Sequence, residues 1–262
     1  MENTHKIDDQ KVKEHFNQKA KLHKNDHAVL DSSTTPKAKH DNYYHHYASL
    51  RAIKTYIPKN NQLTILDFGC GTGRFFPFLS KSFKKVMATD ISNEMLNIAK
   101  NRANRYKNIE VITYDDFNNI ELKVDLAYTF WVLAHCSNEQ LRHIFHRMYS
   151  ILNPHGVFYI FEQVSKNHPL MSDVYYRRSI DDYISIANDE GFICKTTKNI
   201  IRYPSYARSL WSKMPSWCSF LLPILYFIET KTLNRKPEFV EYYTSLIVFK
   251  KNINFVRPKI NL

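Results

Sequence analysis

A run of three glycines behind an acidic residue is the segment whose residue types and spacing most clearly predict chemistry. Residues 67–73 read DFGCGTG and end an apolar stretch that begins at Leu63. Glycine has no Cβ, so a loop of this composition lets the backbone approach a ligand closely. If a helix begins after the loop, its first N–H groups also point at the ligand. The segment therefore predicts a strand that runs into a loop holding a nucleotide or nucleoside.

The position of the third glycine distinguishes between two kinds of loop. A dinucleotide-binding loop follows the pattern GxGxxG. Here Gly73 comes one residue early, and Arg74 occupies the place of the third glycine in that pattern. Asp67 lies two residues before the first glycine, where its carboxylate would repel a pyrophosphate and attract a cation. The loop is therefore expected to hold a positively charged nucleoside.

These features resemble the first motif of the class I (seven-stranded, Rossmann-like) S-adenosylmethionine-dependent methyltransferases, an acidic residue followed by GxGxG. The resemblance covers about residues 45–250. It implies S-adenosyl-L-methionine as the cofactor and methyl transfer as the activity. It also implies that Asp67, Gly69, Gly71 and Gly73 hold the cofactor.

Further cofactor contacts follow from the same resemblance. Asp90, which is expected to close the second strand 21 residues after Gly69, matches the acid that binds both ribose hydroxyls. Ile91 and Met95 would flank the adenine, and Asp115, at the expected end of the third strand, would accept the adenine amino group. The remaining expected contacts are Asp116 and Phe117 along the same edge, and Thr129 and Phe130 below the methionine portion.

Two titratable residues are expected at the carboxyl ends of the strands, where ligands bind in this architecture. His135 follows the fourth strand and Glu162 lies near the end of the fifth. His135 has the ordinary pKa better suited to accepting a proton near neutrality, so it is the first candidate for a general base and Glu162 is the second. Each also has a structural interpretation, as an orienting histidine and as a hydrogen-bonded carboxylate. Because a sulfonium is already activated, positioning alone could also suffice.

Contacts with the methyl acceptor are expected from two further segments. Tyr43 and Tyr47 lie in an aromatic stretch before the first core helix and could belong to a lid, and Arg177 could meet a phosphate or carboxylate. The alternatives are ordinary packing for the two tyrosines and, for Arg177, a helix start that faces solvent. His45 and His46 cannot share a helix face, and no third ligand follows at a spacing typical of a metal site, so no metal site is predicted.

Alternating strands and helices predict an α/β fold with a doubly wound, mostly parallel seven-stranded sheet. The last strand has no crossover helix beside it and is expected to pair antiparallel at the edge. The expected strands lie at 63–69, 85–91, 110–115, 124–130, 156–164, 192–200 and 241–251, and the clearest helices at 42–57, 92–103, 138–152 and 179–190.

The expected domain division is an N-terminal extension or helical lid at 1–41 and a methyltransferase domain at 42–262. A helical insertion is expected at about 204–238, before the last strand. Its apolar run at 216–228 contains Pro223 and is too short to span a bilayer. The favoured interpretation is a helical insertion that packs on the domain and helps to cap the active site. A weak association with a membrane surface is the alternative, because five basic residues flank the run, namely Arg208, Lys213, Lys231, Arg235 and Lys236.

The net charge of +12 leaves several partner classes open. The favoured function is O-methylation of a small molecule or glycan. The alternatives are a nucleic-acid methyltransferase and a non-catalytic cofactor-binding protein. Nucleic acid is disfavoured because residues 130–135 read FWVLAH, without an NPPY-like tetrapeptide for a flipped base. Four widely spaced cysteines and a polar N-terminal segment favour a cytoplasmic protein.

Overall fold

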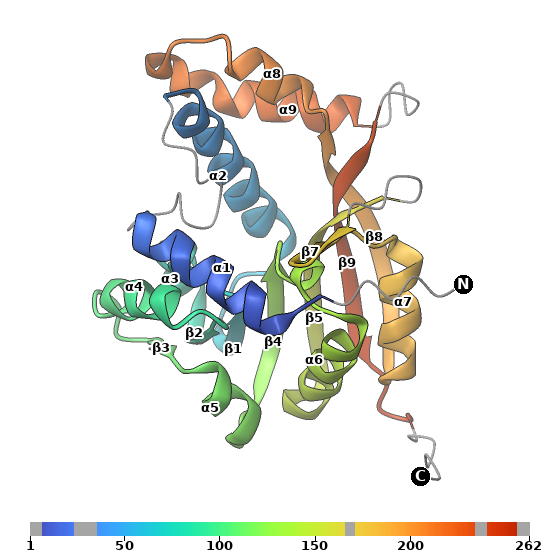
Figure 1. The fold of residues 1–262 in the computed structure, drawn as a ribbon. Helices are drawn as coiled ribbons and strands as arrows, with labels where there is room; N and C mark the ends of the chain where they lie inside the picture. Colours follow the sequence, from blue (N-terminus) through green and yellow to red (C-terminus); the bar gives the residue numbers. More distant parts are fainter. Residues whose placement is uncertain (1–6, 24–35, 166–170, 234–239, 256–262) are drawn as a thin grey trace.

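The computed structural model describes residues 7–23, 36–165, 171–233 and 240–255. In this part of the chain seven strands form one sheet in the order β3-β2-β1-β4-β5-β9-β8 (Figure 1). Strands β1 to β5 and β8 run parallel to one another, and β9 runs antiparallel to both of its neighbours. The strands are β1 Asn60–Phe68, β2 Phe83–Thr89, β3 Ile109–Val111, β4 Val124–Phe130, β5 Leu152–Val164, β8 Phe192–Tyr203 and β9 Tyr242–Lys251.

Helices cover both faces of this sheet, which confirms the doubly wound α/β fold. One face packs against α2 Pro36–Tyr56, α3 Phe76–Ser82 and α4 Asn93–Ala103. The other packs against α5 Tyr114–Asn119, α6 Asn138–Ile151 and α7 Ile180–Asp189. Each core strand is apolar at successive positions because its side chains alternate between two buried faces. Ile65 of β1, for example, packs on the face covered by α2, α3 and α4, and its neighbour Leu66 packs on the face covered by α5, α6 and α7.

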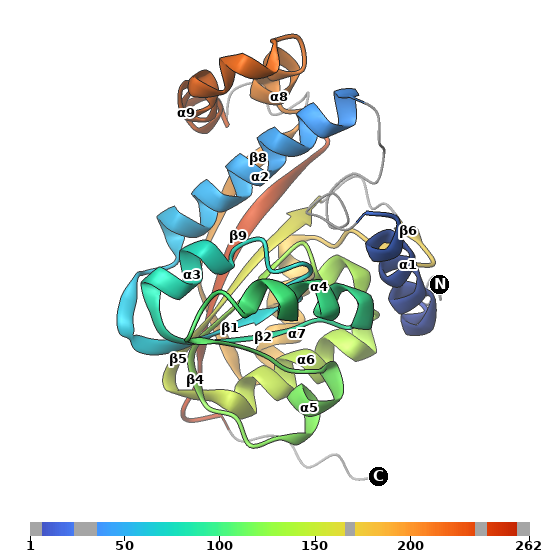
Figure 2. The ribbon, with the colours of Figure 1, turned by 90° about the vertical axis from the view of Figure 1, so that its left-hand side faces the viewer.

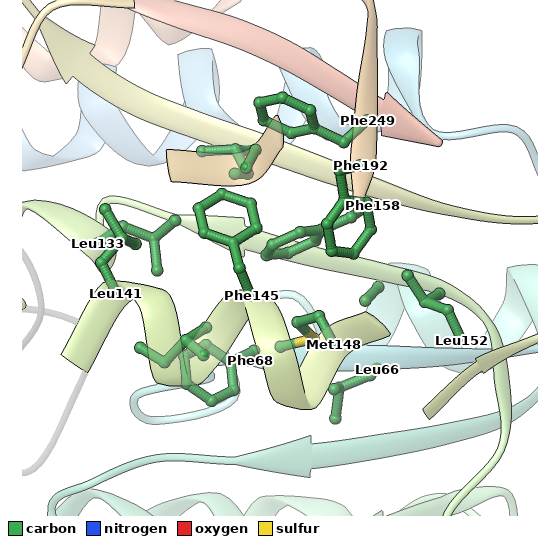
Figure 3. Close-up of a cluster of buried hydrophobic side chains, with 14 of the residues drawn as sticks. Leu66, Phe68, Leu133, Leu141, Phe145, Met148, Leu152, Phe158, Phe192 and Phe249 are labelled. Carbon is green, nitrogen blue, oxygen red and sulfur yellow. The ribbon is translucent and has the colours of Figure 1, made fainter. Parts of the chain in front are cut away.

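Aromatic side chains fill much of the face that α6 covers. Phe145 of α6 lies in contact with Phe158 of β5, Phe192 of β8 and Phe249 of β9, with ring centroids between 5.5 and 5.7 Å apart (Figure 3). Edge-on pairs at such distances contribute to stability beyond the area that they bury. This cluster ties the three strands at the β8 end of the sheet to one helix.

The single antiparallel strand is confirmed, but β9 is the second strand from the edge, because it lies between β5 and β8. Helix α7 carries the chain from β5 past one strand position to β8. Strand β9 then fills the position between β5 and β8. It runs antiparallel to both, so no crossover helix is needed beside it.

The third strand is shorter than the sequence analysis expects. It ends at Val111, and α5 begins at Tyr114. Thr113 caps this helix, because its side chain accepts a hydrogen bond from the N–H of Asp116 while the Asp116 side chain accepts from Thr113. Asp115, Asp116 and Phe117 therefore lie on a helix and not at a strand end.

Four further helical segments of the described residues flank the main body. Helix α1 Asp9–Leu22 lies beside α4, and α8 Tyr206–Trp211, η3 Ser216–Leu221 and α9 Leu222–Thr232 form the expected insertion. Figures 1 and 2 show α8 and α9 beyond the sheet, against the N-terminal half of α2. Tyr44 and Ala48 of α2 pack there against Trp211 and Tyr226, so the insertion does pack on the domain.

The expected division at 41/42 falls inside α2, which begins at Pro36. The division itself stays a prediction. Arg235 and Lys236 lie outside the described residues. Among the helices that the structure describes, none combines the length and the apolar character needed to cross a membrane.

Candidate active site

The glycine loop connects β1 to α3 and follows a path that requires glycine. Gly69, Gly71 and Gly73 all have positive φ, at 76°, 55° and 74°. A Cβ on Gly69 would lie 2.3 Å from the side chain of Val132, and one on Gly73 would lie 2.4 Å from the ring of Phe76. Side chains at these positions are excluded both by the backbone conformation and by the space.

Asp90 follows directly after β2 and faces the loop. Its Oδ2 accepts a hydrogen bond from the N–H of Gly71 at 2.9 Å, and its Oδ1 accepts one from Ser92 at 2.9 Å. Burial raises the pKa of Asp90, and these N–H groups oppose the rise. A carboxylate oxygen has more than one acceptor site, so Asp90 can still accept hydrogen bonds from a ligand.

Asp67 is buried at the end of β1, with 2% of its surface exposed. Its Oδ2 makes no hydrogen bond of ordinary geometry within the described residues. Burial raises the pKa of Asp67 to about 7, although the nearby Arg74 guanidinium opposes the rise. A buried carboxyl in this state would be ionised more readily beside an additional positive charge.

These residues line one pocket, which we call the cofactor pocket. Seven of the predicted cofactor contacts lie in its wall, namely Asp67, Gly69, Gly71, Asp90, Ile91, Met95 and Phe130. Gly73 supports the loop by packing on Phe76 and does not line the pocket.

Four other predicted contacts also lie away from the cofactor pocket. Asp115 and Asp116 occupy the first turn of α5, and Phe117 is fully buried against Phe68. Thr129 is fully buried within β4. Tyr114, one residue before the expected acid, lines the pocket instead.

Helix α1, in the segment expected to form an N-terminal extension or helical lid, closes one side of the cofactor pocket. Val12 and Phe16 line the pocket. Asn17 fastens the helix to the start of α4, where its Oδ1 accepts a hydrogen bond from the Ser92 hydroxyl at 2.7 Å. Lys11 forms an ion pair with Asp173 at 2.8 Å, although both side chains are exposed and the pair adds little stability.

A second pocket adjoins the first, and we call it the acceptor pocket. Asp41, Asn42 and His45 line it from α2, Glu162 and Gln163 from β5, and Arg208 from α8. The aromatic part of its wall is formed by Trp131, Tyr175, Tyr203 and Tyr242. Phe16, Trp131 and His135 line both pockets. The two pockets therefore meet at these three side chains.

His135 lies at this junction, in the short helix η2 Leu133–His135. Its Nδ1 is 2.6 Å from the carbonyl oxygen of Val174, which can only accept, so Nδ1 carries the hydrogen and Nε2 carries the lone pair. Burial lowers the pKa of His135 to about 4. The imidazole is therefore neutral at physiological pH and can accept a hydrogen bond through Nε2.

Glu162 supports the junction from β5. Its Oε1 accepts hydrogen bonds from the N–H groups of Val132 at 2.5 Å and Leu133 at 2.7 Å. Burial raises the pKa of Glu162 to about 7, against the effect of these hydrogen bonds. Trp131, one residue earlier, has a positive φ of 59°, which is rare for a large side chain. Glu162 therefore holds a strained turn in place.

Arg178 holds the other side of the same turn. Its guanidinium donates hydrogen bonds to the carbonyl oxygens of Leu133 at 3.1 Å and Cys136 at 2.6 Å, and to the Asn138 side chain. Arg177 is buried instead against the ring of Tyr242, 3.6 Å from its centroid, and is not part of the acceptor-pocket wall. Arg178 thus holds the turn after β4, and Arg177 packs on Tyr242, a residue of the pocket wall.

Tyr43 and Tyr47 also lie outside the acceptor-pocket wall. They face the insertion, where Tyr43 stacks on Trp211 and Tyr47 contacts Tyr226 edge-on, each at 6.1 Å. Asn42 and His45 are three residues apart on one face of α2, whereas Tyr43 and Tyr47 occupy another. The aromatic stretch thus lies on the helix that lines this pocket, but its two tyrosines face the insertion.

The comparisons with known proteins agree with this arrangement. Residues 65–156 match a family model described as a methyltransferase domain. The crystal structure of geranyl diphosphate C-methyltransferase from Streptomyces coelicolor A3(2), in complex with Mg²⁺, geranyl diphosphate and S-adenosyl-L-homocysteine, superposes with a TM-score of 0.62. The match covers 93% of this chain and 97% of that chain at 12% identity, so it shows a shared fold.

Curated relatives differ in the atom that their names say is methylated. The N-terminal Xaa-Pro-Lys N-methyltransferase 1 of Xenopus tropicalis is 29% identical over 121 residues, which cover 44% of this chain and 54% of that protein. The malonyl-[acyl-carrier protein] O-methyltransferase of Pectobacterium atrosepticum is 32% identical over 106 residues, covering 38% and 39%. The matched segments thus span about half or less of these relatives.

Proposed function

The chain carries the methyltransferase domain of the class I S-adenosylmethionine-dependent family, and we propose that it methylates a hydroxyl group of a small molecule or glycan. The observation that carries this proposal is the shared wall of the two pockets, where His135 and Trp131 stand between them. A donor in one pocket and an acceptor in the other would meet at this wall.

The residues of the cofactor pocket fit S-adenosylmethionine. Asp90 offers a carboxylate to the ribose hydroxyls, and the loop residues Gly69, Cys70 and Gly71 line the same space. The buried Asp67 carboxyl, with a pKa of about 7, suits a ligand that brings positive charge. When bound, this cofactor supplies a methyl group on a sulfonium, which is already activated for displacement.

What the chain itself contributes to the reaction is mainly position. Phe16 and Trp131 border both pockets, and with both ligands bound their rings would exclude water from the space between them. Holding two reactants in near-attack geometry accounts for a large part of the rate in displacements of this kind. Arg178 and Glu162 act through the turn, since they fix the backbone that places Trp131 and His135.

His135 is the residue that would receive the acceptor. Its Nε2 lone pair accepts a hydrogen bond from the acceptor hydroxyl, which aims the oxygen lone pair at the methyl group. The proton then passes to Nε2 as the new bond forms. A pKa of about 4 makes this imidazole a weak base, so the orientation of the hydroxyl is its larger contribution.

The acceptor pocket suits a small polar molecule with a ring face. It is a cavity of about 260 Å³ whose wall combines hydrogen-bonding groups with aromatic rings. Asn42 and Gln163 can each donate and accept, which matches hydroxyl groups. Trp131 and Tyr203 offer flat surfaces on which a sugar or another ring could stack.

The test is a screen for S-adenosylhomocysteine formation with sugars, phenols and amines as acceptors. We expect turnover with a hydroxyl acceptor. His135→Ala should lower kcat at least ten-fold while leaving S-adenosylmethionine affinity unchanged. Turnover confined to amines, or wild-type kcat in the variant, would contradict the assignment.

A specific observation favours N-methylation as the second candidate. Asp41 Oδ1 is buried and makes no hydrogen bond within the described residues, while its Oδ2 is paired with Arg208 at 3.0 Å. A carboxylate oxygen in the acceptor pocket could accept a hydrogen bond from the N–H of a neutral amine, whose nitrogen keeps the lone pair that methyl transfer needs. The relative from Xenopus tropicalis is named as an N-methyltransferase. Asp41→Asn would then raise KM for the amine without changing cofactor affinity.

A further inference from the structure

Exposed apolar side chains gather on the insertion between β8 and β9. We call six of them the insertion patch: Leu210 of α8, Trp217 and Phe220 of η3, and Ile224, Phe227 and Ile228 of α9. Their exposed fractions run from 46% for Ile228 to 73% for Trp217. Single exposed apolar residues are normal on protein surfaces, but six within 19 residues of one segment form a cluster that calls for a partner.

Helix α9 is apolar on two opposite sides. Leu222, Leu225 and Tyr226 face the domain and pack in the cluster with α2. Ile224, Phe227 and Ile228 face outward. A helix that packs on a soluble domain normally presents polar residues on its outer face, and one that is apolar all round has a second apolar environment.

The charges of the same segment all have one sign at the surface. Between residues 204 and 233, Lys213 and Lys231 are exposed. The only acidic residue in this range, Glu229, is 1% exposed and lies 3.5 Å from the Arg202 guanidinium. Over residues 204–233, the part of the insertion that the structure describes, the outer surface therefore combines large apolar side chains with positive charge and has no exposed acid.

We propose that the insertion patch docks on the surface of an anionic lipid membrane. Trp and Phe side chains partition into the region between the headgroups and the acyl chains, and lysines beside them attract anionic headgroups. The outward face of α9 would lie parallel to the membrane plane, since its 11 residues are far too few to cross a bilayer. Positive charge at the rim favours a lipid surface over a second copy of this face, because two such surfaces would bring like charges together.

The insertion patch is separate from both pockets, so the proposal does not depend on methyl transfer. Helix α8 nevertheless connects the two regions. Its Arg208 lines the acceptor pocket, and its Leu210 belongs to the insertion patch. Docking would therefore bring the acceptor side of the molecule toward the membrane.

The experiment is co-sedimentation of the full chain with vesicles of phosphatidylglycerol and phosphatidylcholine, compared with phosphatidylcholine alone. We expect at least ten-fold tighter binding to the anionic vesicles. Trp217→Ser, Phe220→Ser and Phe227→Ser combined should remove at least nine-tenths of it. Ile193→Ser with Ile253→Ser is the matched control, because both residues are exposed apolar positions outside the insertion, and it should bind as the wild type does.

A second pair of substitutions tests the charge. Lys213→Gln and Lys231→Gln should each weaken binding about five-fold, since a basic residue near an anionic surface contributes on the order of 1 kcal/mol. Tryptophan fluorescence reports docking directly, because Trp217 is exposed on the insertion patch, whereas Trp211 is buried and Trp131 is half-buried. The Trp217 fluorescence should shift to the blue with anionic vesicles, and Trp217→Phe should keep binding and lose most of that shift.

Several results would overturn the proposal. One is the absence of binding to anionic vesicles by a wild-type chain with a cooperative melting curve. Another is equal binding by the triple variant and the wild type. If the chain is a dimer in solution and the triple variant is a monomer, the insertion patch is an interface between copies and the proposal is wrong.

Discussion

Burial shifts the pKa of three site residues, two of them upward and one downward. It raises the pKa of Asp67 and of Glu162 to about 7, and it lowers the pKa of His135 to about 4. The cause is the same in each case, since a buried site disfavours the charged form of any group. The site therefore carries less charge near pH 6 than its residue types suggest.

Asp67 should make the affinity for S-adenosylmethionine depend on pH. The positive ligand favours the carboxylate, so binding below pH 7 must also release a proton. Affinity should be constant above pH 7 and fall by up to about ten-fold per pH unit below it. Calorimetric titrations between pH 5.5 and 8.5 measure this. Asp67→Asn is the control, and its affinity should not show this fall below pH 7. The same slope of affinity against pH in both proteins would contradict the role of Asp67.

Glu162 should make the ligand-free protein less stable as the pH rises. Its pKa is about 7 in the folded chain and its ordinary value is 4.5. A raised folded pKa gives stability that is fully present below pH 4.5 and is lost as the pH rises through 7. Between these limits the wild type should lose about 3 kcal/mol of unfolding free energy relative to Glu162→Gln. Denaturant unfolding at several pH values measures the difference, and parallel curves would contradict it.

The residues that sequence could predict are those whose role lies in local backbone geometry. The loop glycines and Asp90 follow from spacing along one strand, one turn and the next strand end. Asp115 could not be placed in this way, because β3 stops at Val111 and a capped helix follows. Pocket residues of α2 were missed for another reason: which face of a helix meets a pocket depends on the partners that cover its other faces.

At the scale of elements, α1 is the segment whose role depends most on distant contacts. It is fastened to α4 by Asn17 and closes both pockets with Phe16. The sequence predicts a helix near the N-terminus. Its docking site could not be predicted, because the hydrogen bond to Ser92 joins residues 75 positions apart.

Phe16→Ala should weaken S-adenosylhomocysteine binding by about ten-fold, which corresponds to about 1.4 kcal/mol. The ring packs edge-on against His135 at 5.0 Å and covers the junction of the pockets. Calorimetry on the folded variant measures the loss. Leu22→Ala on the same helix is the matched control, because Leu22 is 75% exposed. Equal losses in both variants would show that α1 acts only through its general stability.

At the scale of the whole molecule, the mostly parallel seven-stranded sheet and its two layers of helices followed from the alternation of predicted strands and helices. Two features did not. The place of β9 inside the sheet depends on how far α7 carries the chain, which no local pattern records. The insertion was expected to cap the site, and it contributes Arg208 to the acceptor pocket while its outer face stays apolar and exposed.

The central claim is that the cofactor pocket binds S-adenosylmethionine through the loop at 67–73 and Asp90. The most direct test is calorimetric binding of S-adenosylhomocysteine to the wild type, Asp90→Ala and Asp115→Ala. Both acids resemble family cofactor contacts, but only Asp90 lines the pocket. We predict binding by the wild type, at least a 30-fold loss in Asp90→Ala and wild-type affinity in Asp115→Ala. No binding by the wild type, or equal losses in the two variants, would contradict the account.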